Sequence, residues 1–171
     1  ETPIVVRSSS LLEDSFGNAF SGKYESVFCC NRGDRGARLE QLVDAIKRVY
    51  ASALSKDALD YRARHGLLER DEQMAILVQR VAGAFHGNLY FPHLAAVGFS
   101  FNPYGWHEDI DPRAGVLRLV FGLGTRAVER SDDDYTRLVA LNAPHLRPDS
   151  FSDDLPVPAQ QWVDVLDLEQ G

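Results

Sequence analysis

The chain has 171 residues, 44% of them hydrophobic and 25% charged, the ordinary composition of a globular protein with a substantial core. Its formal net charge is -7, so no nucleic-acid partner is expected, because such a surface needs clustered lysine and arginine. Two adjacent cysteines make no disulfide framework, and no apolar run reaches transmembrane length, so the sequence predicts a cytoplasmic protein without a membrane partner.

The first predicted strand covers residues 4–7, ends in Arg7, and runs into a loop of serines and glycines. Three serines follow Arg7 directly, and glycines stand at positions 17 and 22. Arginine presents a planar set of donors that matches phosphate oxygens, and glycine lets backbone N–H groups approach an anion closely. The stretch is compatible with an anion-binding loop and shows no more than that, since it has neither a P-loop nor a G-x-G-x-x-G motif.

A second strand is predicted over residues 24–30, and two helices follow it. Apolar residues at helical spacing run from Leu39 to Ala53. Ser55 is suited to cap the N-terminus of the second helix, and Gly66 is suited to end it.

The remainder of the chain is predicted to consist mainly of strands. Residues 74–81 are almost continuously apolar, which is typical of a central strand. Further strands are expected over residues 94–101, 115–121, 134–141 and 160–168, and residues 144–159 are rich in Pro, Asp and Ser and predict a loop or linker.

Four motifs carry a resemblance to a known family: V-V-R-S-S-S-L-L-E-D, F-S-G-K-Y-E-S, V-Y-A-S-A-L-S-K-D-A-L-D-Y-R and F-G-L-G-T-R-A-V. They resemble motifs of the nucleotide-binding domain of phosphoenolpyruvate synthase and pyruvate phosphate dikinase. A generic helical hairpin would explain the apolar stripe of the third motif but not its ending, Tyr61-Arg62. The resemblance implies an α+β fold similar to part of an ATP-grasp domain, with mixed or antiparallel sheets and a helical pair.

The resemblance covers most of the chain and implies a single domain. Its core is expected over residues 1–143, followed by the linker 144–159 and a final strand within residues 160–171. Because both ends lie close to predicted strands, the chain is interpreted as a fragment of a longer polypeptide. The phosphohistidine carrier domain and the pyruvate-binding domain of the family would then be its partners on that polypeptide.

The resemblance also implies a role for each part of the loop. Arg7 takes the place of the family arginine that contacts the ATP phosphates and stabilises the transferring phosphoryl group, so it is the predicted catalytic residue. Ser8, Ser9, Gly22 and Ser26 are predicted to bind the ATP phosphates together with Arg7. The alternative is an arginine that ends a strand in a surface ion pair.

The adenine and ribose are predicted to lie against Gln79 and Val81. In the family, this strand links the two lobes around the adenine, so its backbone groups and the Gln79 side chain can contact the nucleoside. Equally, Gln79 can be a polar residue that is hydrogen-bonded within a sheet.

Magnesium is the metal that the resemblance implies. Glu13 and Asp14 are weak candidate ligands, because magnesium prefers oxygen atoms. They could equally cap the following turn or balance Arg7. Family members carry glutamate where this chain has Thr125, which removes one candidate carboxylate.

The function implied is ATP-dependent phosphorylation of a carrier histidine and then of pyruvate, as in phosphoenolpyruvate synthase. Two alternatives stay open: a non-catalytic nucleotide-binding or interaction module, and a related dikinase that acts on another acceptor, such as a glucan or an antibiotic. The fragment alone is predicted to be inactive, because an upstream lysine and the downstream D-x-E and Q-x-R motifs of the family are not found in it.

Overall fold

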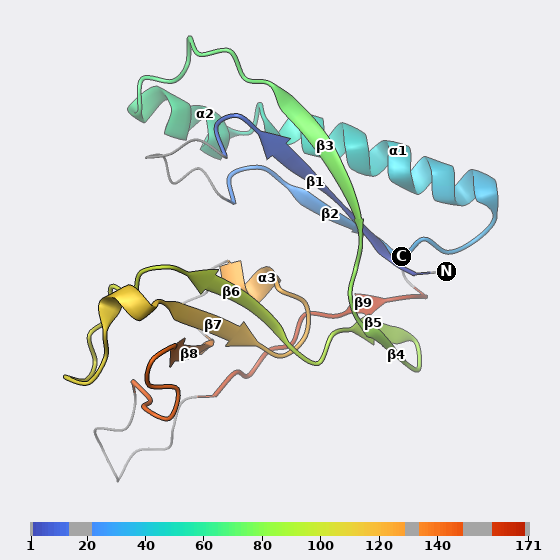
Figure 1. Ribbon diagram of the computed structural model, residues 1–171. Coiled ribbons are helices and arrows are strands. Elements are labelled where there is room, and N and C mark those ends of the chain that lie inside the picture. The colour runs from blue at the N-terminus through green and yellow to red at the C-terminus, as the bar shows by residue number, and fades with distance from the viewer. Residues whose placement is uncertain (1, 14–21, 129–133, 149–158, 170–171) are drawn as a thin grey trace. The chain divides into compact units, whose positions relative to one another are not determined.

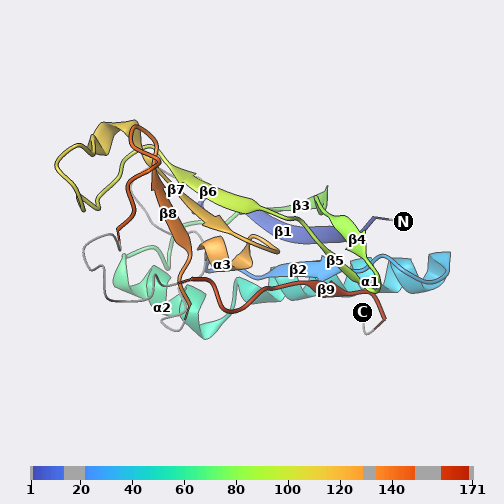
Figure 2. The ribbon, with the colours of Figure 1, turned by 90° about the horizontal axis from the view of Figure 1, so that it is seen from below.

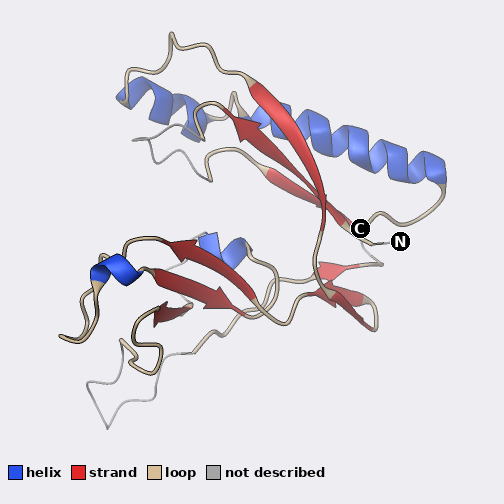
Figure 3. Cartoon of the chain, in the orientation of Figure 1, coloured by secondary structure: helices blue, strands red, loops and turns tan. Residues whose placement is uncertain are grey.

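The computed structural model describes residues 2–13, 22–128, 134–148 and 159–169. The chain divides into two compact units, one made of residues 1–82 and 166–171 and the other of residues 83–165. Each unit combines helices with antiparallel strands (Figure 3), which confirms the predicted α+β class.

The first unit is built on a sheet of three strands. The middle strand β1 (Ile4–Ser10) pairs antiparallel with β2 (Ser26–Cys29) on one side and with β3 (Met74–Arg80) on the other. Helix α1 (Arg35–Ser52) runs along one face of this sheet (Figure 1), and the view turned by 90° shows the same layering (Figure 2). The unit therefore has a sheet with one face covered by a helix.

The core of this unit lies between the sheet and α1. Val6 and Val49 are both 0% exposed, and they pack with the buried residues Val27, Cys29 and Ala45. Burial of each such aliphatic side chain contributes roughly 1.5–3 kcal/mol, so this cluster fixes the helix to one face of the sheet.

Helix α1 begins at Arg35, one turn before Leu39, the first residue of the apolar pattern. The Asp34 carboxylate accepts a hydrogen bond of 2.9 Å from the backbone N–H of Ala37, which is the contact of an N-cap residue. The apolar pattern alone could not show this start, because the first turn of the helix carries no residue of the core.

Helix α2 (Lys56–Arg64) has the ends that the sequence predicts. The Ser55 hydroxyl accepts a hydrogen bond of 3.2 Å from the N–H of Ala58, and Gly66 has a φ of +66° after the helix. A positive φ favours glycine, which has no Cβ to clash, so Gly66 can reverse the chain at this point.

Two strand predictions for the first unit need correction. Strand β1 continues to Ser10 instead of ending at Arg7, because β3 pairs with it as far as Ser10, opposite Met74. Strand β3 was predicted to be central, but it lies at an edge of the described sheet, and its residues Leu77 and Val78 are 40% and 46% exposed.

The second unit contains another antiparallel sheet of three strands. Strand β7 (Val116–Val120) lies between β6 (Ala95–Phe99) and β8 (Arg137–Ala140), close to the predicted positions. A short helix α3 (Thr125–Val128) packs against β6 and β7. The sequence did not predict α3, nor the hairpin of β4 (Ala84–His86) and β5 (Leu89–Phe91), nor the 3-10 turn η1 (Pro112–Ala114).

The predicted last strand, residues 160–168, is mostly wrong. Only β9 (Leu166–Asp167) is a strand. The backbone N–H groups of Gln161 and Trp162 donate to the Asp134 carboxylate at 2.7 Å and 3.4 Å, so a side chain binds this segment. Among the described residues, the Asp134 carboxylate and not a strand accepts the hydrogen bonds of these two backbone groups.

The predicted linker lies largely outside the part of the chain that is described, since residues 149–158 belong to none of the ranges given above. The boundaries of one domain over the whole chain stay a prediction. In the described ranges, no helix has the length and apolar character that crossing a bilayer requires.

Gly122 is a position where the fold depends on glycine, and we expect Gly122→Ala to lower the melting temperature. Its φ is +93°, and a Cβ there would lie 2.6 Å from Val163 Cγ1 and 2.7 Å from the Asp164 carbonyl oxygen. The expected loss is roughly 2 kcal/mol or more, from backbone strain and overpacking together. The matched control is Gly124→Ala, whose Cβ would meet Ala95 Cβ at an ordinary 3.5 Å. Equal thermal unfolding curves for the two variants would contradict this account.

Candidate functional site

The sheet of the first unit separates the residues of β1 onto two faces. Side chains alternate along a strand, so Val6, Ser8 and Ser10 lie on the face that α1 covers, where they are 0%, 4% and 2% exposed. Arg7 and Ser9 point to the opposite face, on which Arg7 is exposed and Ser9 is half-buried. We call this opposite side the open face.

One end of the open face is polar. Arg7 lies directly opposite Ser26 on β2, and the Cα atoms of such a pair are about 4.5–5.5 Å apart. Ser9 follows two residues after Arg7, about 7 Å along the same strand. Within the described ranges no carboxylate pairs with the Arg7 guanidinium, so this cation and the two hydroxyls can be shared by one anion.

Gly22 stands at the described end of the predicted phosphate loop. Its φ is +79°, and no atom lies within 4 Å of the position that a Cβ would occupy. The backbone at Gly22 is therefore open to an approaching group. Residues 14–21, which include Asp14 and the rest of this loop, are outside the described ranges.

Apolar side chains lie beside the polar ones on the open face. Val5 lies opposite Phe28 on β2 and opposite Gln79 on β3, and Leu77 lies opposite Arg7. We call Val5, Phe28 and Leu77 the apolar patch. Val5 and Phe28 lie one two-residue step, about 7 Å, along the strands from Arg7, whereas Leu77 lies directly beside Arg7. No local sequence pattern singles out this patch, because only the pairing of three strands brings its residues together.

Two predicted site residues, Ser8 and Val81, do not present the expected groups to the open face. The Ser8 hydroxyl lies on the face that α1 covers. The Val81 backbone N–H donates a hydrogen bond of 2.9 Å to the Pro3 carbonyl oxygen, so this donor does not point to a ligand. A role for either residue would have to use another backbone group.

Glu13 has a local structural role. Its backbone N–H donates a hydrogen bond of 3.2 Å to the Ser10 hydroxyl, and its Oε2 atom is buried. Across the described part of the chain, no three His, Cys, Asp or Glu side chains are arranged to hold a metal ion. Magnesium in nucleotide sites is commonly held by one or two carboxylates together with phosphate oxygens, so Glu13 as a ligand stays a prediction.

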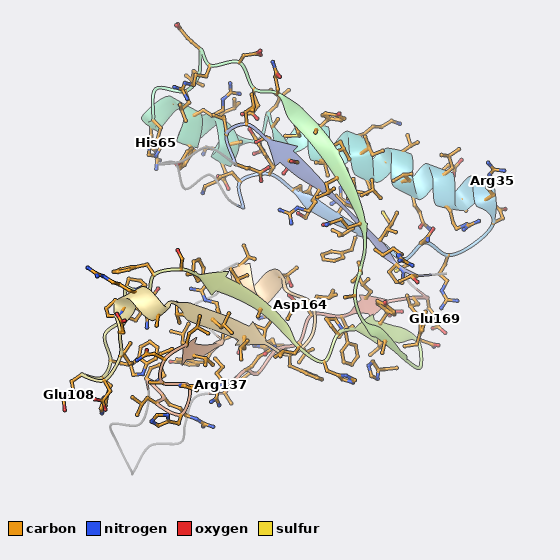
Figure 4. The ribbon with its side chains drawn as sticks, in the orientation of Figure 1. Arg35, His65, Glu108, Arg137, Asp164 and Glu169 are labelled. Atoms are coloured by element: carbon orange, nitrogen blue, oxygen red, sulfur yellow. The ribbon has the colours of Figure 1, made fainter. Side chains whose placement is uncertain are left out.

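In the second unit, a network of charged side chains holds α3. The Thr125 hydroxyl donates to the Asp164 carboxylate at 2.5 Å, and Arg126 Nε donates to the same carboxylate at 2.8 Å. Arg126 Nη1 reaches Asp134 at 3.2 Å, and Figure 4 shows Asp164 beside α3. Thr125 thus serves to bind Asp164, which a glutamate at this position would repel.

The charge of Asp134 is well stabilised. Its side chain is 3% exposed, and burial alone would raise its pKa. The backbone N–H groups of Gln161, Trp162 and Tyr135 and the charge of Arg126 outweigh burial and lower the pKa of the Asp134 carboxyl. These hydrogen bonds fix residues 161–164 to Asp134 and to the start of α3.

The open face carries a cation and hydroxyls, and beside them an apolar patch and an amide. This is the chemistry of a nucleotide-binding α+β domain. The chain belongs to the family of the pyruvate phosphate dikinase AMP/ATP-binding domain, which matches residues 1–158. A rifampicin phosphotransferase of Streptomyces sviceus is 28% identical over 127 residues, an alignment that covers 74% of this chain and 13% of that protein. The chain therefore spans a small part of the length of this relative.

Proposed function

We propose that this chain is the ATP-binding part of a phosphotransferase that resembles phosphoenolpyruvate synthase. The observation that carries the proposal is the shared position of Arg7, Ser9 and Ser26 at the polar end of one open sheet face. The polypeptide would phosphorylate a histidine on a carrier domain at the expense of ATP, and a pyruvate-binding domain would accept the group. The carrier and acceptor domains are partners implied by the family.

The polar end of the open face would bind and position the phosphates. The guanidinium of Arg7 would contact the phosphate oxygens and offset the negative charge that spreads over the transferring group. The Ser26 and Ser9 hydroxyls and the backbone at Gly22 would hold the remaining oxygens. Most of the rate acceleration in such a reaction comes from positioning and charge stabilisation, which these groups supply without a covalent step on this chain.

The apolar patch would bind the nucleoside. Val5, Phe28 and Leu77 offer a surface on which a planar base can lie, and the Gln79 amide beside them can both donate and accept hydrogen bonds. The magnesium ion that the family implies would be held by phosphate oxygens and one or two carboxylates, for which Glu13 and Asp14 are the candidates.

A second candidate function is supported by the relative from Streptomyces sviceus, whose name gives rifampicin as its acceptor. A dikinase that uses an acceptor other than pyruvate would need the same ATP-binding face. A non-catalytic nucleotide-binding module would need it as well, so the face alone favours none of the acceptors.

The test is calorimetric titration of the polypeptide that carries this chain with ATP, adenosine and inorganic triphosphate, each with magnesium. We expect ATP to bind more tightly than either half-molecule, because only ATP uses both the polar end and the apolar patch of the open face. Formation of acid-labile phosphohistidine from ATP labelled in its terminal phosphate would separate the phosphotransferase from a non-catalytic module. Failure of ATP to bind saturably would overturn the proposal.

A further inference from the structure

Arg62 closes helix α2 and ties it to the turn that follows. Its Nη2 atom donates hydrogen bonds to the carbonyl oxygens of Arg70 at 3.0 Å and Leu68 at 3.5 Å. Its own carbonyl accepts a hydrogen bond of 2.7 Å from the N–H of Leu67, across the reversal at Gly66. The stretch between α2 and β3 (Figure 1) is therefore held to the helix end at several points by one residue.

The turn after α2 places Leu67 in a small core at the end of the sheet. Leu67, Tyr24 and Leu12 are 6%, 6% and 3% exposed, and they form one buried cluster with Ala58 of α2. Leu12 and Tyr24 stand on either side of the loop that contains Gly22. The packing of the loop's two ends thus depends on where the turn after α2 lies.

Several polar atoms of the residues around this cluster are also buried. Glu13 Oε2, both carboxylate oxygens of Glu72 and Arg62 Nε are all buried. Burial, and then the charge of Glu72, raise the pKa of the Tyr24 hydroxyl, while the charge of Arg62 acts in the opposite direction. The positive charge of Arg62 therefore acts on the buried Tyr24 hydroxyl against the charges of Glu72 and Glu13.

We propose that Arg62 is a positioning residue for the nucleotide site: through the turn at residues 67–72 it holds Leu12 and Tyr24, and thereby sets where Gly22 lies relative to Arg7. This inference rests on the proposed function, since it gives Arg62 a role in the same ATP site without contact to ATP. It also gives a physical reason for the Tyr61-Arg62 pair in the last turn of α2, which has no proposed role in binding the phosphates.

The first measurement does not need nucleotide. In the polypeptide that carries this chain, Arg62→Ala should speed amide hydrogen exchange in peptides that contain Gly22 and Tyr24. The matched control is Arg64→Ala, since Arg64 lies on the same helix, is exposed, and makes no hydrogen bond or ion pair with the described residues. Equal exchange in the two variants would overturn the positioning role, whether or not ATP binds.

The second measurement is a double-mutant cycle with ATP. We expect Arg62→Ala to raise the Kd for ATP about tenfold, and Gly22→Ala to have much less effect in the Arg62 variant than in the wild type, because the backbone at Gly22 is then already displaced. A merely structural role predicts a lower melting temperature with additive effects on Kd. Additive effects would therefore refute the inference.

Arg62→Lys keeps the positive charge but loses the planar fork that spans two carbonyl groups. If Arg62→Ala does not fold, Arg62→Lys replaces it in both measurements. A wild-type protein that binds no ATP would contradict the proposed function, while the exchange measurement would still decide whether Arg62 positions Gly22 and Tyr24.

Discussion

Replacement of Arg7 by alanine is expected to weaken ATP binding by about 10- to 100-fold, the range for loss of a charged hydrogen-bonding group. Phosphoryl transfer should fall further, by about 100- to 1,000-fold, because the guanidinium acts most strongly on the charge of the transition state. Arg7→Lys should recover part of the binding but not the full rate, since lysine keeps the charge and loses the fork. Calorimetry and single-turnover phosphohistidine formation measure the two effects.

The matched control is Arg80→Ala. Arg80 is an exposed arginine on β3 of the same sheet, but it pairs with Ile4 and so lies on the side away from the open face. Its replacement should leave both binding and transfer within about twofold of the wild type. If Arg7→Ala and Arg80→Ala behave alike, the assignment of Arg7 is wrong.

Asp134→Asn is expected to destabilise the second unit and to reduce its sensitivity to acid. The carboxylate accepts hydrogen bonds from Arg126 and from the backbone of the segment at residues 161–162, and the neutral amide has one acceptor oxygen in place of two. We expect the melting temperature at pH 7 to fall by roughly 5 °C or more.

The direction of the acid effect follows from the lowered pKa of the Asp134 carboxyl. A depressed pKa in the folded state means that the stabilisation is full above the unfolded value, about 4, and is lost as the pH falls below it. Wild-type protein should therefore lose more stability than Asp134→Asn between about pH 5 and pH 3. Glu108→Gln is the control, because Glu108 is exposed and pairs with none of the described residues. Parallel pH profiles for wild type and Asp134→Asn would contradict the prediction.

Much of the first unit could be predicted from the sequence because its signals are local. The apolar spacing predicts α1, and Ser55 with Gly66 predicts both ends of α2. A residue pattern of this kind depends only on neighbours within a few turns, so one sequence is enough to show it.

The positions of the serines could not be predicted in the same way. Ser8 and Ser9 are adjacent and chemically identical, and only the pairing of β1 with β3 places them on opposite faces. Long-range pairing also decides that β3 lies at an edge and that Asp134 replaces a strand as partner of residues 161–162. These features depend on residues far apart in the chain, which a local pattern does not contain.

The hydrogen bond between Thr125 and Asp164 makes these two positions interdependent in evolution. With glutamate at position 125, two carboxylates would face each other where a hydroxyl now donates at 2.5 Å. A lineage can exchange one residue only if the other changes as well, or if a further cation offsets the added charge. The two positions should therefore covary among homologues, although 39 positions separate them along the chain.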